Sequence, residues 1–189
     1  MASATLPTRL CPRCERAACL CALLPAEPLA NATQLLILQD PGERLQAKGT
    51  LPLLRLGLQH CQVRVGEQFD PALLHSERHT LLLYPPSPGD EAPPVISAQP
   101  PPEGLRLIVL DGTWRKSRKL LHQNPWLAAL PRLSLDAAEP ARYGALRRAQ
   151  RPGQLSTLEA SLLALEQLEG PHFEPLWLAF ERFVALRSG

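Results

Sequence analysis

Residues 105–123 read LRLIVLDGTWRKSRKLLHQ, an apolar run followed by a polar turn and a basic stretch. The run LRLIVL has the length of a strand and is apolar enough to be buried on both faces of a sheet. The basic stretch is expected to form a helix. In open α/β sheets ligands bind beyond the carboxyl ends of the strands, so Asp111 and the turn after it occupy a favoured position for a site. A second interpretation, equally compatible with the local sequence, is that Asp111 or Thr113 only caps the helix.

Other segments predict the same type of architecture. Apolar runs of strand length occupy residues 33–39, 61–65 and 80–84. A helical pattern covers residues 43–58, although Pro52 should kink or divide that helix. Strands interleaved with helices predict an α/β fold with a mostly parallel sheet.

The C-terminal part of the chain predicts two helices. Ser156-Thr157-Leu158-Glu159 has the form of a capping box, in which the serine hydroxyl and the glutamate carboxylate bind free backbone amides at a helix start. Leu158, Leu162 and Leu165 then repeat at helical spacing. A second helix is expected to begin near Pro175.

Composition bounds the class of protein. The 189 residues suffice for one catalytic domain, expected at 31–189, preceded by a cysteine-rich segment at 1–30. No apolar run approaches the roughly 20 residues that span a bilayer, and no secretory signal is recognisable, which favours a cytoplasmic protein without a membrane partner. A monomer is expected, since no apolar stripe is left for a partner. The net charge of +2 neither requires nor excludes a nucleic acid. Residues 85–102, rich in proline, predict a spacer.

Four of the five cysteines fall within the short segment CPRCERAACLC. They are Cys11, Cys14, Cys19 and Cys21. In a reducing compartment such a cluster favours metal binding over disulfides, and four thiolates can complete a tetrahedral structural zinc site. An iron–sulfur cluster, redox-active thiols or no metal are the alternatives. Cys61 stands apart and is interpreted as a small buried hydrophobe.

Two groups of basic residues flank the turn at Asp111. On a helical period the first group forms one face, made of Arg115, Arg118, Lys119 and His122. The second group lies with Tyr143 in a loop containing Gly and Pro, and comprises Arg142, Arg147, Arg148 and Arg151. Either group alone is more often a solvated surface, but two groups beside one candidate pocket favour contacts with RNA phosphates and bases.

Several cofactor-binding and catalytic motifs are missing from the sequence. It contains no GxxxxGK[ST] phosphate loop, no GxGxxG after a strand, no GxSxG elbow and no HExxH. The residues therefore indicate an α/β protein with a metal-binding segment and a basic site around Asp111, and do not name a reaction.

The chain resembles the DTW-domain family, which is named for an Asp-x-Thr-Trp motif. That motif is present as Asp111-Gly112-Thr113-Trp114, together with the N-terminal CxxCxxxxCxC cluster common in the family. Further similarities are LPR at 130–132, Arg142-Tyr143 and LSTLEA at 155–160. These motifs occurring together and in order are far more specific than any one of them.

The chain departs from the family pattern after the first strand. Family members often show a His-Pro-x-Glu turn there, followed soon by an Asn-Thr pair. Here these stretches read Asp40-Pro41-Gly42-Glu43 and Gly49-Thr50. No family role is carried over to Asp40 or Gly49, whereas Glu43 and Thr50 remain candidates.

The resemblance implies a SPOUT-like fold, a mostly parallel sheet with helices on both faces and a C-terminal knot. It implies transfer of the 3-amino-3-carboxypropyl group of S-adenosylmethionine to N3 of a tRNA uridine, with release of methylthioadenosine. Asp111, whose pKa burial is expected to raise, is predicted to be the base for N3. The predicted donor-binding residues are Thr113, Trp114, Ser156, Thr157 and Glu159, although the capping box gives Ser156 and Glu159 a structural explanation.

Two alternatives share the same sequence features. A SPOUT-type RNA methyltransferase would use the same donor and form adenosylhomocysteine. A non-catalytic, zinc-containing RNA-binding protein would bind tRNA and leave the donor unchanged.

Overall fold

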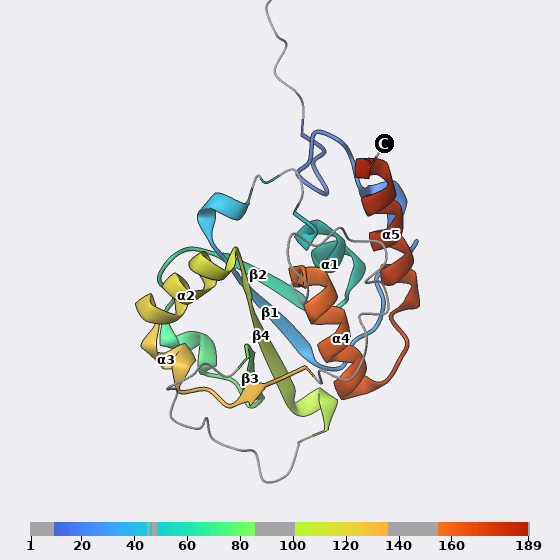
Figure 1. Ribbon diagram of the computed structural model, residues 1–189. Helices are drawn as coiled ribbons and strands as arrows, with labels where there is room; N and C mark the ends of the chain where they lie inside the picture. The colour runs from blue at the N-terminus through green and yellow to red at the C-terminus, as the bar shows by residue number, and fades with distance from the viewer. Residues whose placement is uncertain (1–9, 45, 47–48, 86–100, 136–154, 189) are drawn as a thin grey trace, which may run out of the picture.

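The computed structural model describes residues 10–44, 46, 49–85, 101–135 and 155–188. Its centre is a five-stranded sheet of order β2-β1-β4-β3-β5 in which every described pairing is parallel (Figure 1). The strands are β1 (Gln34–Gln39), β2 (Cys61–Val65), β3 (His79–Leu83), β4 (Leu105–Asp111) and β5 (Arg132–Leu133). The predicted α/β fold with a mostly parallel sheet is confirmed.

Five α-helices and four short 3-10 turns complete the described part of the chain. The helices are α1 (Leu51–Gly57), α2 (Trp114–Gln123), α3 (Pro125–Ala128), α4 (Thr157–Glu169) and α5 (Glu174–Ser188). The 3-10 turns are Cys21–Leu23, Pro41–Glu43, Pro71–Leu74 and Pro102–Gly104. Within the described residues, no helix has both the length and the apolar character needed to cross a membrane.

The central strands of the sheet are buried on both faces. Alternate residues of a strand point to opposite faces, so Leu35 and Ile37 pack into one core whereas Leu36 and Leu38 pack into the other. The first core contains residues of α1, α4 and α5, and the second contains residues of α2 and α3. Figure 1 shows these two helical layers on opposite sides of the strands. Helices on both faces explain why β1, β3 and β4 are apolar, whereas the edge strand β2, with the sequence CQVRV, is largely exposed.

The helix predicted over residues 43–58 is wrong in its start. The structure places a 3-10 turn at Pro41–Glu43, capped by the Asp40 side chain, and begins α1 only at Leu51. Pro52 then lies in the first turn of α1, where its missing amide is not needed by the helix. The proline sets the helix start instead of producing a kink.

The two C-terminal helices agree with the sequence pattern. The Ser156 hydroxyl accepts from the Glu159 amide at 3.2 Å, and the Glu159 carboxylate accepts from the Ser156 amide at 2.7 Å. This capping box starts α4, and Gly170, with φ of 89°, ends it in a conformation that favours glycine. The predicted knot depends on the path of residues 136–154, which lie outside the described residues, and stays a prediction.

The strand order creates a topological switch point between β1 and β4. These strands are neighbours, yet the chain leaves β1 towards β2 at one edge and leaves β4 towards β5 at the other edge. Connections that diverge in this way open a crevice at the carboxyl ends of the two strands, where α/β proteins commonly bind ligands. Asp40 and Asp111 lie at this point, and Gln39 is paired in register with Asp111.

Candidate active site at the carboxyl ends of the strands

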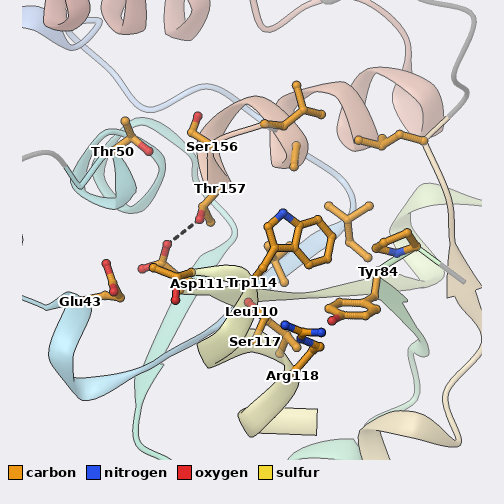
Figure 2. Close-up of a pocket in the computed structure, with 18 of the residues that line it drawn as sticks. Glu43, Thr50, Tyr84, Leu110, Asp111, Trp114, Ser117, Arg118, Ser156 and Thr157 are labelled. Carbon is orange, nitrogen blue, oxygen red and sulfur yellow. Dashed lines mark hydrogen bonds between the residues drawn. The ribbon is translucent and has the colours of Figure 1, made fainter. Parts of the chain in front are cut away.

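A cavity of about 940 Å³ lies at the carboxyl ends of β3 and β4. Its wall combines the turn after β4, the first turn of α2 and the first turn of α4 (Figure 2). Among the lining residues are Glu43, Thr50, Tyr84, Asp111, Thr113, Trp114, Arg115, Arg118, Ser156 and Thr157. The cavity thus brings together the Asp-Gly-Thr-Trp turn and the start of α4, which lie far apart in the sequence.

Asp111 is held by one neutral donor on each carboxylate oxygen. Thr157 Oγ1 donates to Oδ1 at 2.5 Å, and Gln39 Nε2 donates to Oδ2 at 2.7 Å. Figure 2 shows Asp111 and Thr157 pointing towards one another from β4 and α4. Each oxygen has a second lone-pair direction, so the carboxylate can accept a further hydrogen bond or a proton from a ligand.

The pKa of Asp111 is raised above the ordinary value for an aspartate. Burial is the largest cause, because it disfavours the charged form, and the negative charge of Glu43 acts in the same direction. The hydrogen bonds from Thr157 and Gln39 and the positive charge of Arg16 oppose the rise without cancelling it. A carboxylate with a raised pKa is a better proton acceptor than a solvated one.

Asp40 occupies the neighbouring strand end and has a different environment. Its amide donates to the carbonyl of Asp111 at 3.1 Å, and its Oδ1 accepts from the Gly42 amide at 2.9 Å. Lys116 Nζ lies 3.0 Å from Asp40 Oδ1 and 2.7 Å from Glu43 Oε1. The lysine therefore anchors the turn after β1 to α2.

Trp114 and Tyr84 form an aromatic wall of the cavity. Trp114 is 47% exposed, and its ring meets the buried Tyr84 ring edge to face with centroids 5.7 Å apart. The guanidinium of Arg132, the first residue of β5, lies over the Tyr84 ring, 5.2 Å from its centroid. An exposed indole backed by a fixed ring is a suitable surface for stacking a purine or pyrimidine.

The structure separates the predicted basic residues. Arg115 and Arg118 are exposed and line the cavity. Lys119 instead pairs with Glu67 at 2.8 Å, outside the cavity wall. The second predicted group, Arg142, Arg147, Arg148 and Arg151, falls outside the described residues.

The predicted donor-binding residues also divide into two sets. Thr113 caps α2 and lines the cavity beside Trp114, and Ser156 and Thr157 line it from α4. Glu159 is 4% exposed, and it is not among the residues that line the cavity. Its Oε2 accepts hydrogen bonds from the Ser156 amide and the Ser156 hydroxyl. Thr113 caps α2 and Ser156 caps α4, and both residues also line the cavity. A capping role and a role in the site are therefore compatible.

The four N-terminal cysteines converge on one point. Their sulfur atoms all lie within 4.8 Å of one another, with Cys19 and Cys11 3.5 Å apart and Cys11 and Cys21 3.9 Å apart. Tetrahedral zinc at about 2.3 Å from each thiolate places the sulfurs ~3.8 Å apart. The cluster can therefore hold a metal ion.

The thiols of the cluster differ in acidity. Backbone amides of Cys14 and Arg13 lower the pKa of Cys11 to about 6, whereas burial and the neighbouring thiols raise the pKa of Cys21 to about 12. Four adjacent thiolates repel one another, and a divalent cation removes that cost. Cys61 lies away from the cluster and burial raises the pKa of its thiol to about 12, which agrees with a packing role.

Residues 8–188 match the model of the DTW domain. The chain belongs to the DTW-domain family. It is 33% identical over 171 residues to "tRNA-uridine aminocarboxypropyltransferase 2" of Macaca fascicularis, covering 84% of this chain and 56% of that protein. It is 32% identical to the protein of the same name from Drosophila melanogaster, covering 84% of this chain and 66% of that protein.

A plant protein gives a third comparison. The chain is 30% identical over 140 residues to "tRNA-uridine aminocarboxypropyltransferase A" of Arabidopsis thaliana, covering 60% of this chain and 50% of that protein. The chain thus spans between half and two thirds of the length of these relatives. No solved structure matches the chain.

Sequence reasoning missed several residues of the site. No local sequence pattern around Lys116 predicts its ion pairs with Asp40 and Glu43. Gln39 ends an apolar strand and gives no sign of its contact with Asp111. Tyr84 was expected only as a strand residue. The position of Gln39 and Tyr84 at strand ends was the one available signal, because those ends meet at a single edge of a parallel sheet.

Proposed function

We propose that this chain transfers the 3-amino-3-carboxypropyl group of S-adenosylmethionine to N3 of a uridine in tRNA, releasing methylthioadenosine. The observation that carries the proposal is Asp111, a carboxylate with a raised pKa in a cavity at the switch point of the sheet. Its motif is the one that names the family, and the relatives named above are uridine aminocarboxypropyltransferases of tRNA.

The role of the cavity in this proposal is to hold the donor and the uridine in a fixed relative position. Its volume of about 940 Å³ lies at the upper end of the range of roughly 300–1,000 Å³ for small-molecule sites, which gives room for a nucleoside donor and an inserted base. S-adenosylmethionine supplies an electrophilic carbon next to its sulfonium. Which of the three such carbons reacts depends on which one the protein holds in line with the nucleophile.

Asp111 accepts the proton of uridine N3 in this proposal. The N3–H group is a weak acid, so its nitrogen becomes an effective nucleophile only as a base removes the proton. Thr157 and Gln39 hold the carboxylate in one orientation and leave it a free lone-pair direction on each oxygen. Burial keeps water away from the proton-accepting group and raises its pKa.

The donor is assigned to the wall between α2 and α4. Thr113 and Trp114 would contact it from the first turn of α2, and Ser156 and Thr157 from the first turn of α4. Glu159 would contribute by fixing Ser156 through the capping box. Tyr84 fixes the Trp114 ring from behind.

The tRNA is assigned to the open side of the cavity, where Arg115 and Arg118 are exposed. Lys119, next to them on α2, would extend this surface. Arg142, Arg147 and Arg148, outside the described residues, are proposed RNA contacts from the sequence. Arg118→Glu should weaken tRNA binding and make the logarithm of affinity fall less steeply with salt, because one phosphate contact is lost. Arg182→Glu is the matched control, since Arg182 is exposed on α5. Equal tRNA affinity of the Arg118→Glu variant and the control would contradict the assignment.

The cysteine cluster is proposed to bind one structural zinc ion through Cys11, Cys14, Cys19 and Cys21. The sulfur separations and the all-thiolate donor set fit tetrahedral zinc, and four protein ligands leave no position for a substrate. Elemental analysis of protein purified without chelator should give one zinc per chain. A ratio near zero would reject the zinc assignment.

The experiment that tests the reaction combines purified protein, unmodified tRNA and S-adenosylmethionine. Nucleosides and small molecules are then identified by mass spectrometry, with a reaction lacking tRNA as the control. Aminocarboxypropyl-uridine together with methylthioadenosine is the expected result. Methylated nucleoside with adenosylhomocysteine would assign a methyltransferase instead, and tRNA binding without any product would assign a binding protein.

A further inference from the structure

Arg16 lies in the loop that carries the four cysteines, but its side chain contacts residues outside that loop. The residue lies between Cys14 and Cys19 in the chain, and its carbonyl accepts from the Cys11 amide at 2.9 Å. Only 7% of Arg16 is exposed. Its guanidinium donates from Nη1 to the carbonyl of Gln46 at 2.6 Å and from Nη2 to the carbonyl of Gly49 at 3.5 Å. A buried cation with two backbone partners thirty residues away is an unusual use of a loop arginine.

The carbonyls that Arg16 binds belong to the segment that leads into the cavity. Gly49 and Thr50 line the cavity at one end of this segment, and Glu43 lines it at the other. The Gln46 amide donates to the Glu43 carbonyl at 3.1 Å, and the Gly49 amide donates to the Gln46 carbonyl at 2.9 Å. These two hydrogen bonds therefore link the backbones of Glu43, Gln46 and Gly49, and the Gln46 carbonyl also accepts from Arg16.

The packing around Gly49 shows how closely Arg16 approaches this segment. A Cβ added to Gly49 would lie 2.9 Å from Arg16 Nη2, so any side chain there displaces the guanidinium. The charge of Arg16 also reaches the site, because it opposes the rise in the pKa of Asp111. Burying an arginine costs free energy that neutral carbonyls offset only in part, which points to a positional role.

We propose that Arg16 is a positioning residue that links the cysteine cluster to the cavity. The cluster fixes the Arg16 backbone, and the Arg16 guanidinium fixes the carbonyls of Gln46 and Gly49, next to the cavity residue Thr50. The proposal rests on the proposed function in one respect, that this cavity is the active site. A metal ion at the cysteines then stabilises the wall of a site that it does not touch.

Hydrogen exchange measured by mass spectrometry tests this link without any substrate. Arg16→Met should retain one metal ion per chain and speed exchange at the amides of Gln46 and Gly49 by tenfold or more, a change of about 1.4 kcal/mol in local opening. Exchange in β4 should stay at the wild-type rate. Arg13→Met is the matched control, because Arg13 lies in the same loop with an exposed side chain, and it should match wild type throughout.

Two further perturbations approach the same contact from other directions. Removing the metal from the wild-type protein with a chelator should speed exchange at Gln46 and Gly49 as Arg16→Met does. Gly49→Ala should do so with the metal retained, since it displaces the guanidinium from the opposite side. Unchanged exchange at both amides in Arg16→Met, or an equal acceleration in β4, would overturn the proposal.

Kinetics separate positioning from bulk stability. Arg16→Lys keeps the positive charge but cannot bridge two carbonyls, whereas Arg16→Met loses both properties. Both variants should raise KM for S-adenosylmethionine. Only Arg16→Met should move the acid limb of the kcat/KM profile to higher pH, because the cation that favours ionised Asp111 is gone while Glu43 remains. If wild-type protein forms no product, the proposed function fails, and the exchange result still decides the link.

Discussion

Two aspartates follow neighbouring strands of the same sheet and have opposite acid–base properties. Asp40 follows β1 and Asp111 ends β4, and a backbone hydrogen bond of 3.1 Å joins the two residues. The pKa of Asp111 is raised by burial. Burial acts on the pKa of Asp40 in the same direction, but the hydrogen bond and charge of Lys116, with the Gly42 amide, outweigh it and hold the pKa below its ordinary value.

The difference comes from the partners. Lys116 gives Asp40 a full positive charge at 3.0 Å, which fixes the carboxylate as an anion. Among the described residues, the side chains that donate to Asp111 are those of Thr157 and Gln39, both neutral, which orient it without neutralising its charge. Of two adjacent carboxylates, one is therefore part of the scaffold and the other is available to accept a proton.

The largest expected effect is on catalysis by Asp111→Asn. The variant keeps the shape of the side chain and removes the base, so kcat/KM should fall by about 10²–10⁴-fold. Asp40→Asn should lose less than about tenfold, because Asp40 is not among the residues that line the cavity. Product formation measured by mass spectrometry gives both values. Full turnover by the Asp111→Asn variant would contradict the role of the base.

Stability should show the reverse order. Asp40→Asn removes a buried, charge-assisted partner of Lys116 and should lower the free energy of unfolding by about 2 kcal/mol. Asp111→Asn should lower it little or not at all at neutral pH. Lys119→Met is the control, since its pair with Glu67 is exposed on both sides and screened by solvent, so the free energy of unfolding should stay close to the wild-type value. Urea denaturation measures all three; equal losses for both aspartates would remove the distinction between them.

The pH dependence of stability should have opposite signs at the two positions. A lowered pKa at Asp40 means that its contribution is present above the ordinary value of 3.8 and is lost as the pH falls through the folded-state pKa. A raised pKa at Asp111 means that folding binds a proton above pH 3.8, so its contribution decreases as the pH rises through the folded-state pKa. The free energy of unfolding is measured across pH for wild type and for each Asn variant. The difference between wild type and each variant isolates the contribution of that aspartate. Parallel curves would show that the partners do not decide the pKa.

The smallest expected effect is that of Thr157→Val. The hydroxyl donates to Asp111 and lowers its pKa, so its removal should move the acid limb of kcat/KM to higher pH. Losing one neutral hydrogen bond of about 1 kcal/mol should reduce the rate by about fivefold at most on the plateau. Ser161→Ala is the control, because its hydroxyl donates to a backbone carbonyl within α4, and its pH profile should match wild type. An unshifted limb in Thr157→Val would show that the hydroxyl does not tune Asp111.

Part of the fold and the site could be predicted from local sequence. The strand 105–110 was recognisable because a strand buried on both faces must be continuously apolar. The cap at Ser156 was recognisable because donor and acceptor lie three residues apart. The cysteine spacing predicted a cluster, and the four sulfurs do converge.

Other features needed the assembled chain. β5 is only two residues long and, among the described strands, pairs with β3, which no local pattern predicts. The contact of Arg16 with Gln46 and Gly49 links segments that share no local pattern. The basic face expected on α2 was divided by the tertiary structure, which placed Arg118 at the cavity and paired Lys119 with Glu67.

The sequence by itself determined the four longer strands, the caps of α2 and α4, the cysteine cluster and the turn that carries Asp111. Each of these follows from spacing within a few residues, where the geometry of helix and strand is fixed. Only the tertiary structure decided that Asp111 faces Thr157 and Gln39 while Asp40 faces Lys116. In the sequence, these partners are 46 to 76 residues from the aspartate that they contact. A pKa depends on charges and burial in space, so the packing of β1, β4, α2 and α4 settles which carboxylate can accept a proton.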